Sequence, residues 1–273
     1  MKRLIVTADD FGYSKYTNNA IIECFRKGFV TSTSLTVNNK HFNGSIKILK
    51  QNKNLDVGIH INLTEFKPLT KSKALIDRNG AFIDKSRWFD GYYKKIDKNE
   101  IENEINAQIL KAISSRLNIT HINGHNHIHI FPNIIDVVVT LAKKYKIKYV
   151  RLPNEKIVNE TQKQSSELQK RNIMAKFSKS AKDKILKNGL KTTDAYYGIL
   201  DMNDLDFDRL SMALASIKDG TSELMVHPAY VDKNGDIFHR LKQREKEIKL
   251  LTNNKIKQLI KKRGIKLINF SQI

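Results

Sequence analysis

The chain has 273 residues, of which 40% are hydrophobic and 28% charged, and it carries a formal net charge of +21. This length and composition exclude a disordered chain and fit one large domain, a size at which α/β barrels are common. The lysines are spread along the whole chain, without a dense basic tract or an aromatic RNA-binding signature. We therefore expect a solvated basic surface and no nucleic-acid binding.

The single cysteine, Cys24, excludes an intrachain disulfide and fits a reducing compartment. The apolar run near the N-terminus, Leu4 to Val6, is too short for the core of a signal peptide. No stretch is long and apolar enough to span a membrane. We therefore expect a cytoplasmic protein that does not bind membranes.

Short β-branched runs alternate with longer helical patterns along the chain. In the N-terminal half, the patterns predict a strand over 3–8, a helix over 15–27, a strand over 30–37, a helix over 42–51, a strand over 56–63, loops over 64–93, a helix over 98–117, a strand over 119–125 and a helix over 133–145. In the C-terminal half, they predict a strand over 147–152, helices over 168–186 and 204–218, a strand over 223–227, helices within 240–262 and a last strand over 266–270. This alternation predicts a parallel sheet, open or closed into a barrel, in a single domain over residues 1–273.

Four polar signals stand at the predicted carboxyl ends of strands, where parallel α/β folds build active sites. They are the pair Asp9-Asp10 in TADDFG, His60 in GIHINLT, His125 in HINGHNHIHIFP and His227 in MVHPAY. One aspartate with two histidines would form a metal site with positions left for water and substrate. The second aspartate can then accept a proton from bound water, and His227 can protonate a leaving group.

Each signal also has a structural alternative. The two aspartates can cap the helix that follows them, and a lone His60 is more often a hydrogen-bonded strand residue than a ligand. The alternating histidines of residues 121–132 either lie on one face of a strand, aimed at a common point, or reflect composition alone. A straight strand would send Asp9 and Asp10 to opposite sides, so both serve one site only if the chain bends, which Gly12 allows. Four such signals together favour a site.

Six segments of the chain resemble the YdjC-like carbohydrate deacetylases, the family that includes chitooligosaccharide deacetylases. They occur in the family's order and spacing between residues 4 and 232, and they read LIVTADDFGYS, GFVTSTSLTVN, VGIHINLT, THINGHNHIHIFP, DAYYG and LMVHPAYVD. The resemblance implies an irregular (β/α) barrel of about seven parallel strands that binds one divalent metal ion, Mg or Zn. It implies removal of an N-acetyl group from an amino sugar or chitooligosaccharide, with or without a phosphate group, and release of acetate. It also suggests a homodimer.

Carried over to this sequence, the resemblance implies that His60 and His125 bind the metal. It implies that the aspartate pair supplies a third ligand and a base, as in the more distant NodB-like polysaccharide deacetylases. We assign Asp10 to the metal and Asp9 to the base, although the sequence allows the reverse order.

The resemblance also makes His227 the candidate acid, and Arg151, at a strand end, the residue that orients the base. Where the family usually has Asp-Ser-His-His-His, this chain has Asn123-Gly124-His125-Asn126-His127. Asn123 keeps an acceptor oxygen but lacks the negative charge of the aspartate. The polar stretch 154–191 is longer than expected for the family, and we interpret it as a helical insertion at an edge of the site or on the surface.

Two other functions fit parts of the pattern. Amidohydrolases and polymerase-associated phosphoesterases are also metal-dependent, but they place an HxH pair on the first strand, whereas the first strand here ends in two aspartates. A basic binding protein with a vestigial site is disfavoured because the full set of aspartates and histidines is present.

Overall fold

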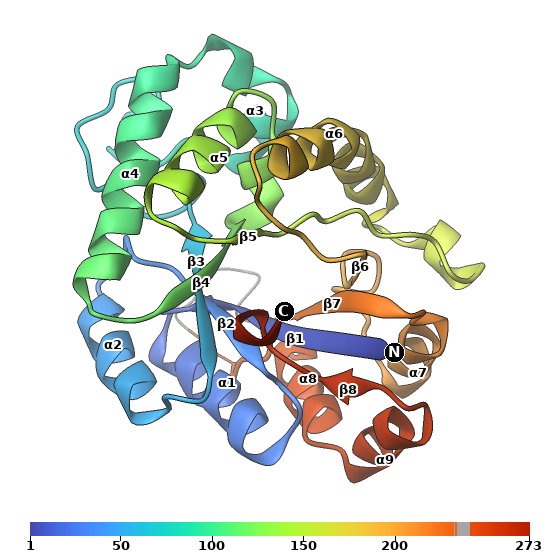
Figure 1. The fold of residues 1–273 in the computed structure, drawn as a ribbon. Coiled ribbons are helices and arrows are strands. Elements are labelled where there is room, and N and C mark those ends of the chain that lie inside the picture. Colours follow the sequence, from blue (N-terminus) through green and yellow to red (C-terminus); the bar gives the residue numbers. More distant parts are fainter. Residues whose placement is uncertain (232, 234–240) are drawn as a thin grey trace.

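The strands form one parallel, curled sheet surrounded by helices, as the computed structural model shows for residues 1–231, 233 and 241–273 (Figure 1). The strand order is β5-β4-β3-β2-β1-β7-β6, and β8 pairs with β1. The two ends of this order, β5 and β6, approach each other through isolated bridges such as Glu155↔Tyr196. The expected α/β barrel of irregular form is therefore confirmed.

The strands are β1 (Lys2–Phe11), β2 (Ser32–Leu35), β3 (Asp56–Ile61), β4 (Ile119–Gly124), β5 (Tyr149–Val150), β6 (Ala195–Tyr197), β7 (Gly220–Val226) and β8 (Lys266–Leu267). The helices are α1 (Lys15–Lys27), α2 (Phe42–Gln51), α3 (Lys85–Phe89), α4 (Lys98–Ser114), α5 (Ile134–Lys144), α6 (Leu168–Lys187), α7 (Phe207–Ser216), α8 (Gln243–Leu251) and α9 (Asn254–Lys262). Most predicted elements are present, but β6 and α3 were not predicted. Asp232, the last residue of the motif LMVHPAYVD, and Arg240, the first residue of the predicted helical range 240–262, lie outside the described residues.

Apolar faces of the helices pack against the sheet to form the core. On α4, Ile101, Ile105 and Ile109 are fully buried at successive four-residue steps, as the sequence predicts. On α6, Met174 and Ile185 are buried, and Leu186 is exposed. Ile173 and Phe177 are partly buried against the core, so this helix packs on the body of the protein. Within the described ranges, no helix combines the length and apolarity needed to cross a bilayer.

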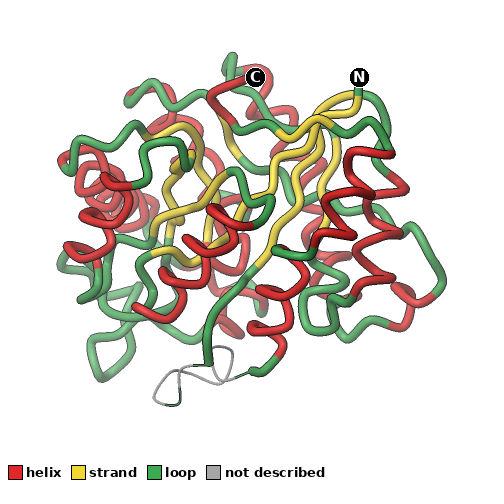
Figure 2. Tube along the Cα trace, turned by 90° about the horizontal axis from the view of Figure 1, so that it is seen from below, coloured by secondary structure: helices red, strands yellow, loops and turns green. Residues whose placement is uncertain are grey.

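The amino ends of the strands and the carboxyl ends lie at opposite ends of the barrel. Both chain termini lie at the amino end of β1 (Figure 2). The barrel interior near this end holds His121 of β4, whose ring stacks on Phe270 with a centroid separation of 4.0 Å. His121 therefore fills the core at this end of the barrel.

Gly58 of β3 leaves the space that the His121 ring fills. A Cβ atom at residue 58 would lie 2.3 Å from His121 Nε2, and this ring is fully buried. We expect Gly58→Ala to lower the free energy of unfolding by about 1–3 kcal/mol through overpacking, measured by urea denaturation. Gly44→Ala is the matched control, since a Cβ at this position in α2 meets nothing within 4 Å and should slightly stabilise the helix. Equal stability of the two variants would contradict this account of residue 58.

Candidate active site

A cleft of about 890 Å³ opens at the carboxyl ends of the strands. Its lining includes the site residues expected at four strand ends, which are Asp9, Asp10, His60, His125 and His227. The fifth strand-end candidate, Arg151, is fully buried and contacts Asp9. The fold thus brings together residues that are up to 218 positions apart in the sequence.

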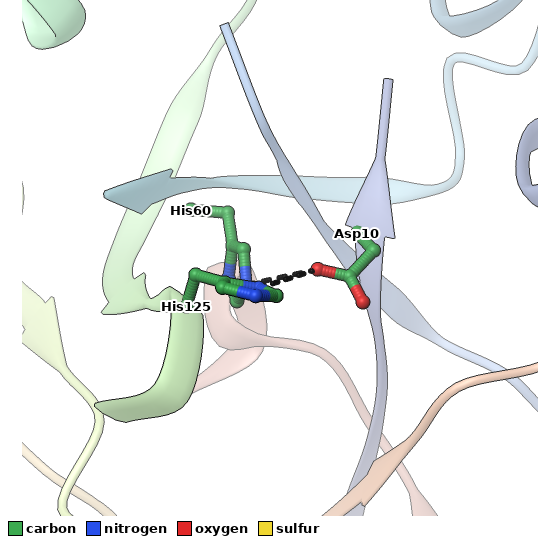
Figure 3. Close-up of side chains that lie close together, drawn as sticks. All are labelled: Asp10, His60 and His125. Atoms are coloured by element: carbon green, nitrogen blue, oxygen red, sulfur yellow. Dashed lines mark hydrogen bonds and ion pairs between the residues drawn. The ribbon is translucent and has the colours of Figure 1, made fainter. Parts of the chain in front are cut away.

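Asp10, His60 and His125 converge on one point of this cleft (Figure 3). Asp10 Oδ1 lies 3.2 Å from His60 Nε2 and 3.2 Å from His125 Nδ1. One ligand atom from each residue lies within 4.8 Å of the others. A carboxylate oxygen and two imidazole nitrogens at this spacing fit a single zinc or other first-row divalent ion, and they leave coordination positions for water and substrate.

Asp10 reaches this point because β1 bends at its end. Asp10 has a φ of 67° and Gly12 a φ of 93°, and the register between β1 and β2 shifts between Ala8 and Phe11. Such an irregularity re-aims side chains that a straight strand would send to opposite faces. The expected bend is confirmed, and it lies at Asp10 itself as well as at Gly12. The capping alternative is wrong, because the N-cap of α1 is Ser14, whose side chain accepts from Thr17 N–H.

Asn123 connects the two parts of the site. Its Oδ1 lies 2.7 Å from His60 Nδ1, and its Nδ2 donates to Asp9 Oδ1 at 3.1 Å. Asn123 Oδ1 can only accept, so a proton on His60 Nδ1 would be donated to it and would leave Nε2, which faces Asp10, free to bind a metal. An aspartate at residue 123 would offer no donor to Asp9 and would place a second carboxylate beside it. The side-chain amide of Asn123 can therefore serve both neighbours, as an acceptor for His60 and a donor to Asp9.

Asp9 lines the cleft and belongs to a buried charge network. The Arg151 guanidinium donates to both of its carboxylate oxygens at 2.5 and 2.9 Å, and Ser34 Oγ donates to Oδ1 at 2.8 Å. Burial opposes the charge of Asp9, but the Arg151 guanidinium outweighs this and holds the pKa of Asp9 well below its usual range. On its other side, Arg151 donates to Glu223 at 2.8–2.9 Å.

The histidine-rich segment does not continue as a strand. β4 ends at Gly124, and residues 125–130 form a 3-10 segment in which Asn126 and His127 have positive φ angles of 53° and 60°. Of the later histidines, His129 donates from Nε2 to the carbonyl of Arg151 at 3.0 Å. The alternation of histidines thus does not aim them at one point. The segment changes direction sharply after β4 and contributes His125 to the candidate ligand set of the cleft.

His125 is held between two carboxylates. Burial disfavours its charged form, but Glu65 and Asp10 outweigh burial and raise the pKa of His125 to about 10. At His227 burial acts in the same direction but prevails, and it lowers the pKa to about 3. The backbone N–H of His227 donates to Glu247 Oε2 at 2.6 Å, and Glu247 is paired with the buried Arg244. His227 is therefore a neutral imidazole on a fixed backbone.

Sequence reasoning missed three charged residues near the cleft. Glu65 and Lys170 line it, and Glu223 is the second partner of Arg151. Glu65 follows the GIHINLT motif at a strand end, so the strand-end rule was sufficient to select it. Glu223 is a carboxylate inside the apolar strand SELMV, which is itself a signal of a buried charged partner.

A comparison with known families matches residues 3–262 to the model described as YdjC-like protein. The chain belongs to the YdjC-like family. The carbohydrate deacetylase of Thermoanaerobacter pseudethanolicus is 33% identical to this YdjC-like chain, and the match covers 99% of each chain. The chitooligosaccharide deacetylase of Yersinia enterocolitica is 31% identical, with 99% of this chain and 98% of that protein covered.

A solved structure shares the fold of this YdjC-like protein over almost its full length. It is described as a putative cellobiose-phosphate cleavage protein from Enterococcus faecalis. The two structures superpose with a TM-score of 0.80 at 25% sequence identity, and the match covers 99% of this chain and 98% of the other.

Proposed function

We propose that the protein is a metal-dependent carbohydrate deacetylase that removes an N-acetyl group from an amino sugar or chitooligosaccharide and releases acetate. The observation that carries this proposal is the convergence of Asp10, His60 and His125 on one point of an open cleft. Relatives named carbohydrate deacetylase, similar along their whole length, support the choice of reaction.

Asp10, His60 and His125 would hold one divalent ion, zinc or magnesium. When bound, such an ion lowers the pKa of a coordinated water and polarises the amide carbonyl. Two imidazoles among three ligands suit zinc better than magnesium, which prefers oxygen ligands. Metal analysis of protein purified without chelator identifies the ion.

The other residues of the site move protons in the proposed reaction. Water adds to the carbonyl carbon of the acetamide while Asp9 accepts one of its protons, and the C–N bond breaks as His227 gives a proton to the departing amine. Arg151 and Asn123 keep the Asp9 carboxylate ionised and fixed in orientation. Because burial keeps its imidazole neutral, His227 takes up a proton from solvent before it gives one to the amine, and Asp9 returns the proton of water to solvent.

The cleft offers both apolar and charged surface to a sugar. Phe89 and Ile173 are among its apolar lining residues, and Lys85 and Lys170 supply positive charge. Burial lowers the pKa of Lys170, so an anionic substituent on the substrate would stabilise its ammonium form. This supports a phosphorylated sugar as one substrate to test beside the neutral one.

The proposed function is tested by measuring acetate release from a panel of N-acetylated sugars. The panel contains chitobiose, longer chitooligosaccharides and a phosphorylated disaccharide, each with metal and with excess chelator. We expect release from at least one member, loss of release with chelator and recovery when zinc or magnesium is added back. Absence of acetate from every member, with either metal present, would exclude this function.

A further inference from the structure

Glu65, like Asp10, lies 3.2 Å from a ring nitrogen of His125, and its backbone is held in place. Its N–H donates to Asn62 Oδ1 at 3.0 Å. Its carbonyl accepts from Asn62 Nδ2 at 2.9 Å and from Asn38 Nδ2 at 3.1 Å. Both asparagines are buried. The backbone of Glu65 is thus fixed at the rim of the cleft by two side chains that are themselves part of the core.

The Glu65 carboxylate faces the side of the His125 ring that points away from Asp10. Glu65 Oε1 lies 3.2 Å from His125 Nε2, and His125 Nδ1 lies 3.2 Å from Asp10 Oδ1. Each ring nitrogen therefore faces one carboxylate. A neutral imidazole carries its proton on one nitrogen only, and the other nitrogen is the one that can bind a metal.

His60 shows the same arrangement with a different partner. Its Nε2 faces Asp10, and its Nδ1 lies 2.7 Å from Asn123 Oδ1. The orienting acceptor of His60 is a buried neutral amide on the adjacent strand. At His125 the corresponding position is taken by the Glu65 carboxylate, which lies in the loop after β3, and the segment that follows His125 turns away with left-handed residues at Asn126 and His127.

We propose that Glu65 is a positioning residue that accepts a hydrogen bond from Nε2–H of His125 and so presents the unprotonated Nδ1 to the metal. This inference rests on the metal site of the proposed function. Hydrogen-bond acceptors behind a ligating histidine fix its tautomer and ring orientation and raise its basicity, and their loss commonly weakens metal affinity about 10–100-fold. Glu65 would act through His125 and would not itself be a ligand.

Zinc affinity of metal-free protein, measured by competition with a chromophoric chelator, tests this role. We expect Glu65→Ala to weaken zinc binding about 10–100-fold. Glu65→Gln keeps a neutral acceptor oxygen and should recover most of the loss. Asp90→Ala is the matched control, since Asp90 also lines the cleft and its removal should leave zinc affinity within about twofold, well under the loss expected for an orienting partner.

A spectroscopic measurement separates positioning from a general effect on folding. In long-range ¹H–¹⁵N spectra of the zinc-loaded protein, His125 should carry its proton on Nε2, and this proton should exchange faster with solvent in Glu65→Ala. Wild-type zinc affinity in Glu65→Ala would overturn the inference and leave the metal site intact. A Glu65→Gln variant as weak as Glu65→Ala would also overturn it, because it would indicate that the charge or direct ligation matters. Absence of zinc binding by the wild type would overturn the inference, whereas the proposed function would fall only if magnesium also failed to bind and to support acetate release.

Discussion

Replacing Asp10 with alanine is expected to abolish both metal binding and acetate release. Asp10 supplies the oxygen ligand of the converging set, and its Oδ1 lies 3.2 Å from a nitrogen of each histidine. Without it, the proposed ligand set keeps two neutral imidazoles and loses its anionic ligand, so it would hold a divalent ion far more weakly. Metal content and acetate release of the purified variant provide the two measurements.

Asp183→Ala is a suitable control for the loss of one carboxylate. Asp183 is exposed on α6, and its removal should leave both measurements unchanged. An Asp10→Ala protein that still retains a stoichiometric ion would show that the ligand set is wrong. In that case the reverse assignment, with Asp9 as the ligand, becomes the next one to test.

Replacing Asp9 with asparagine is expected to spare metal binding and to lower kcat by about 10²–10⁴-fold, the usual contribution of a general base. The amide keeps the size of the side chain, but it cannot accept a proton at neutral pH. Isothermal titration with zinc should give an affinity close to that of the wild type. Full turnover in Asp9→Asn with metal bound would remove Asp9 from its proposed role.

Asp9→Asn also removes the charge that pairs with Arg151. A second variant is therefore needed to separate loss of the base from loss of this ion pair. Glu223→Gln perturbs the same guanidinium from its other side, where Arg151 Nε donates to Glu223 Oε1 at 2.9 Å. The Glu223 side chain is not among the residues that line the cleft. If Asp9 is the base, Glu223→Gln should lower kcat far less than Asp9→Asn. Equal losses would indicate that the orientation of Arg151, and not proton transfer by Asp9, limits the reaction.

The sequence predicted most elements because their periodicity is long and strong. The ranges of α1 and α2 agree with the predicted helices to the residue, since each has a continuous amphipathic pattern. β6 was missed because it has three residues and no alternation that a window can detect. The histidine-rich segment was harder still. Its period-two spacing is typical of a strand, but left-handed backbone at two residues ends the regular structure.

The candidate site could be selected from strand ends alone, because parallel strands present their carboxyl ends at the same rim. The contacts that hold the site residues in place could not be predicted from the sequence. The contact between Glu65 and His125 joins residues 60 positions apart, and the contact between Arg151 and Glu223 joins residues 72 positions apart. No local pattern specifies such pairs, since they depend on how neighbouring strands are aligned. Asn123 shows this well, because only the folded chain reveals that both ends of its amide are used.

The pairing of β1 has a consequence for how the protein is made. Residues 2–8 align with residues 220–226, so one edge of β1 stays open until nearly the whole polypeptide has left the ribosome. This edge belongs to a strand whose residues 4–6 are fully buried in the finished molecule. An apolar strand with unmet backbone groups attracts other strands, and nascent chains in this state are prone to aggregate. Yield of the protein in cells should therefore depend on protection of its first strand during translation.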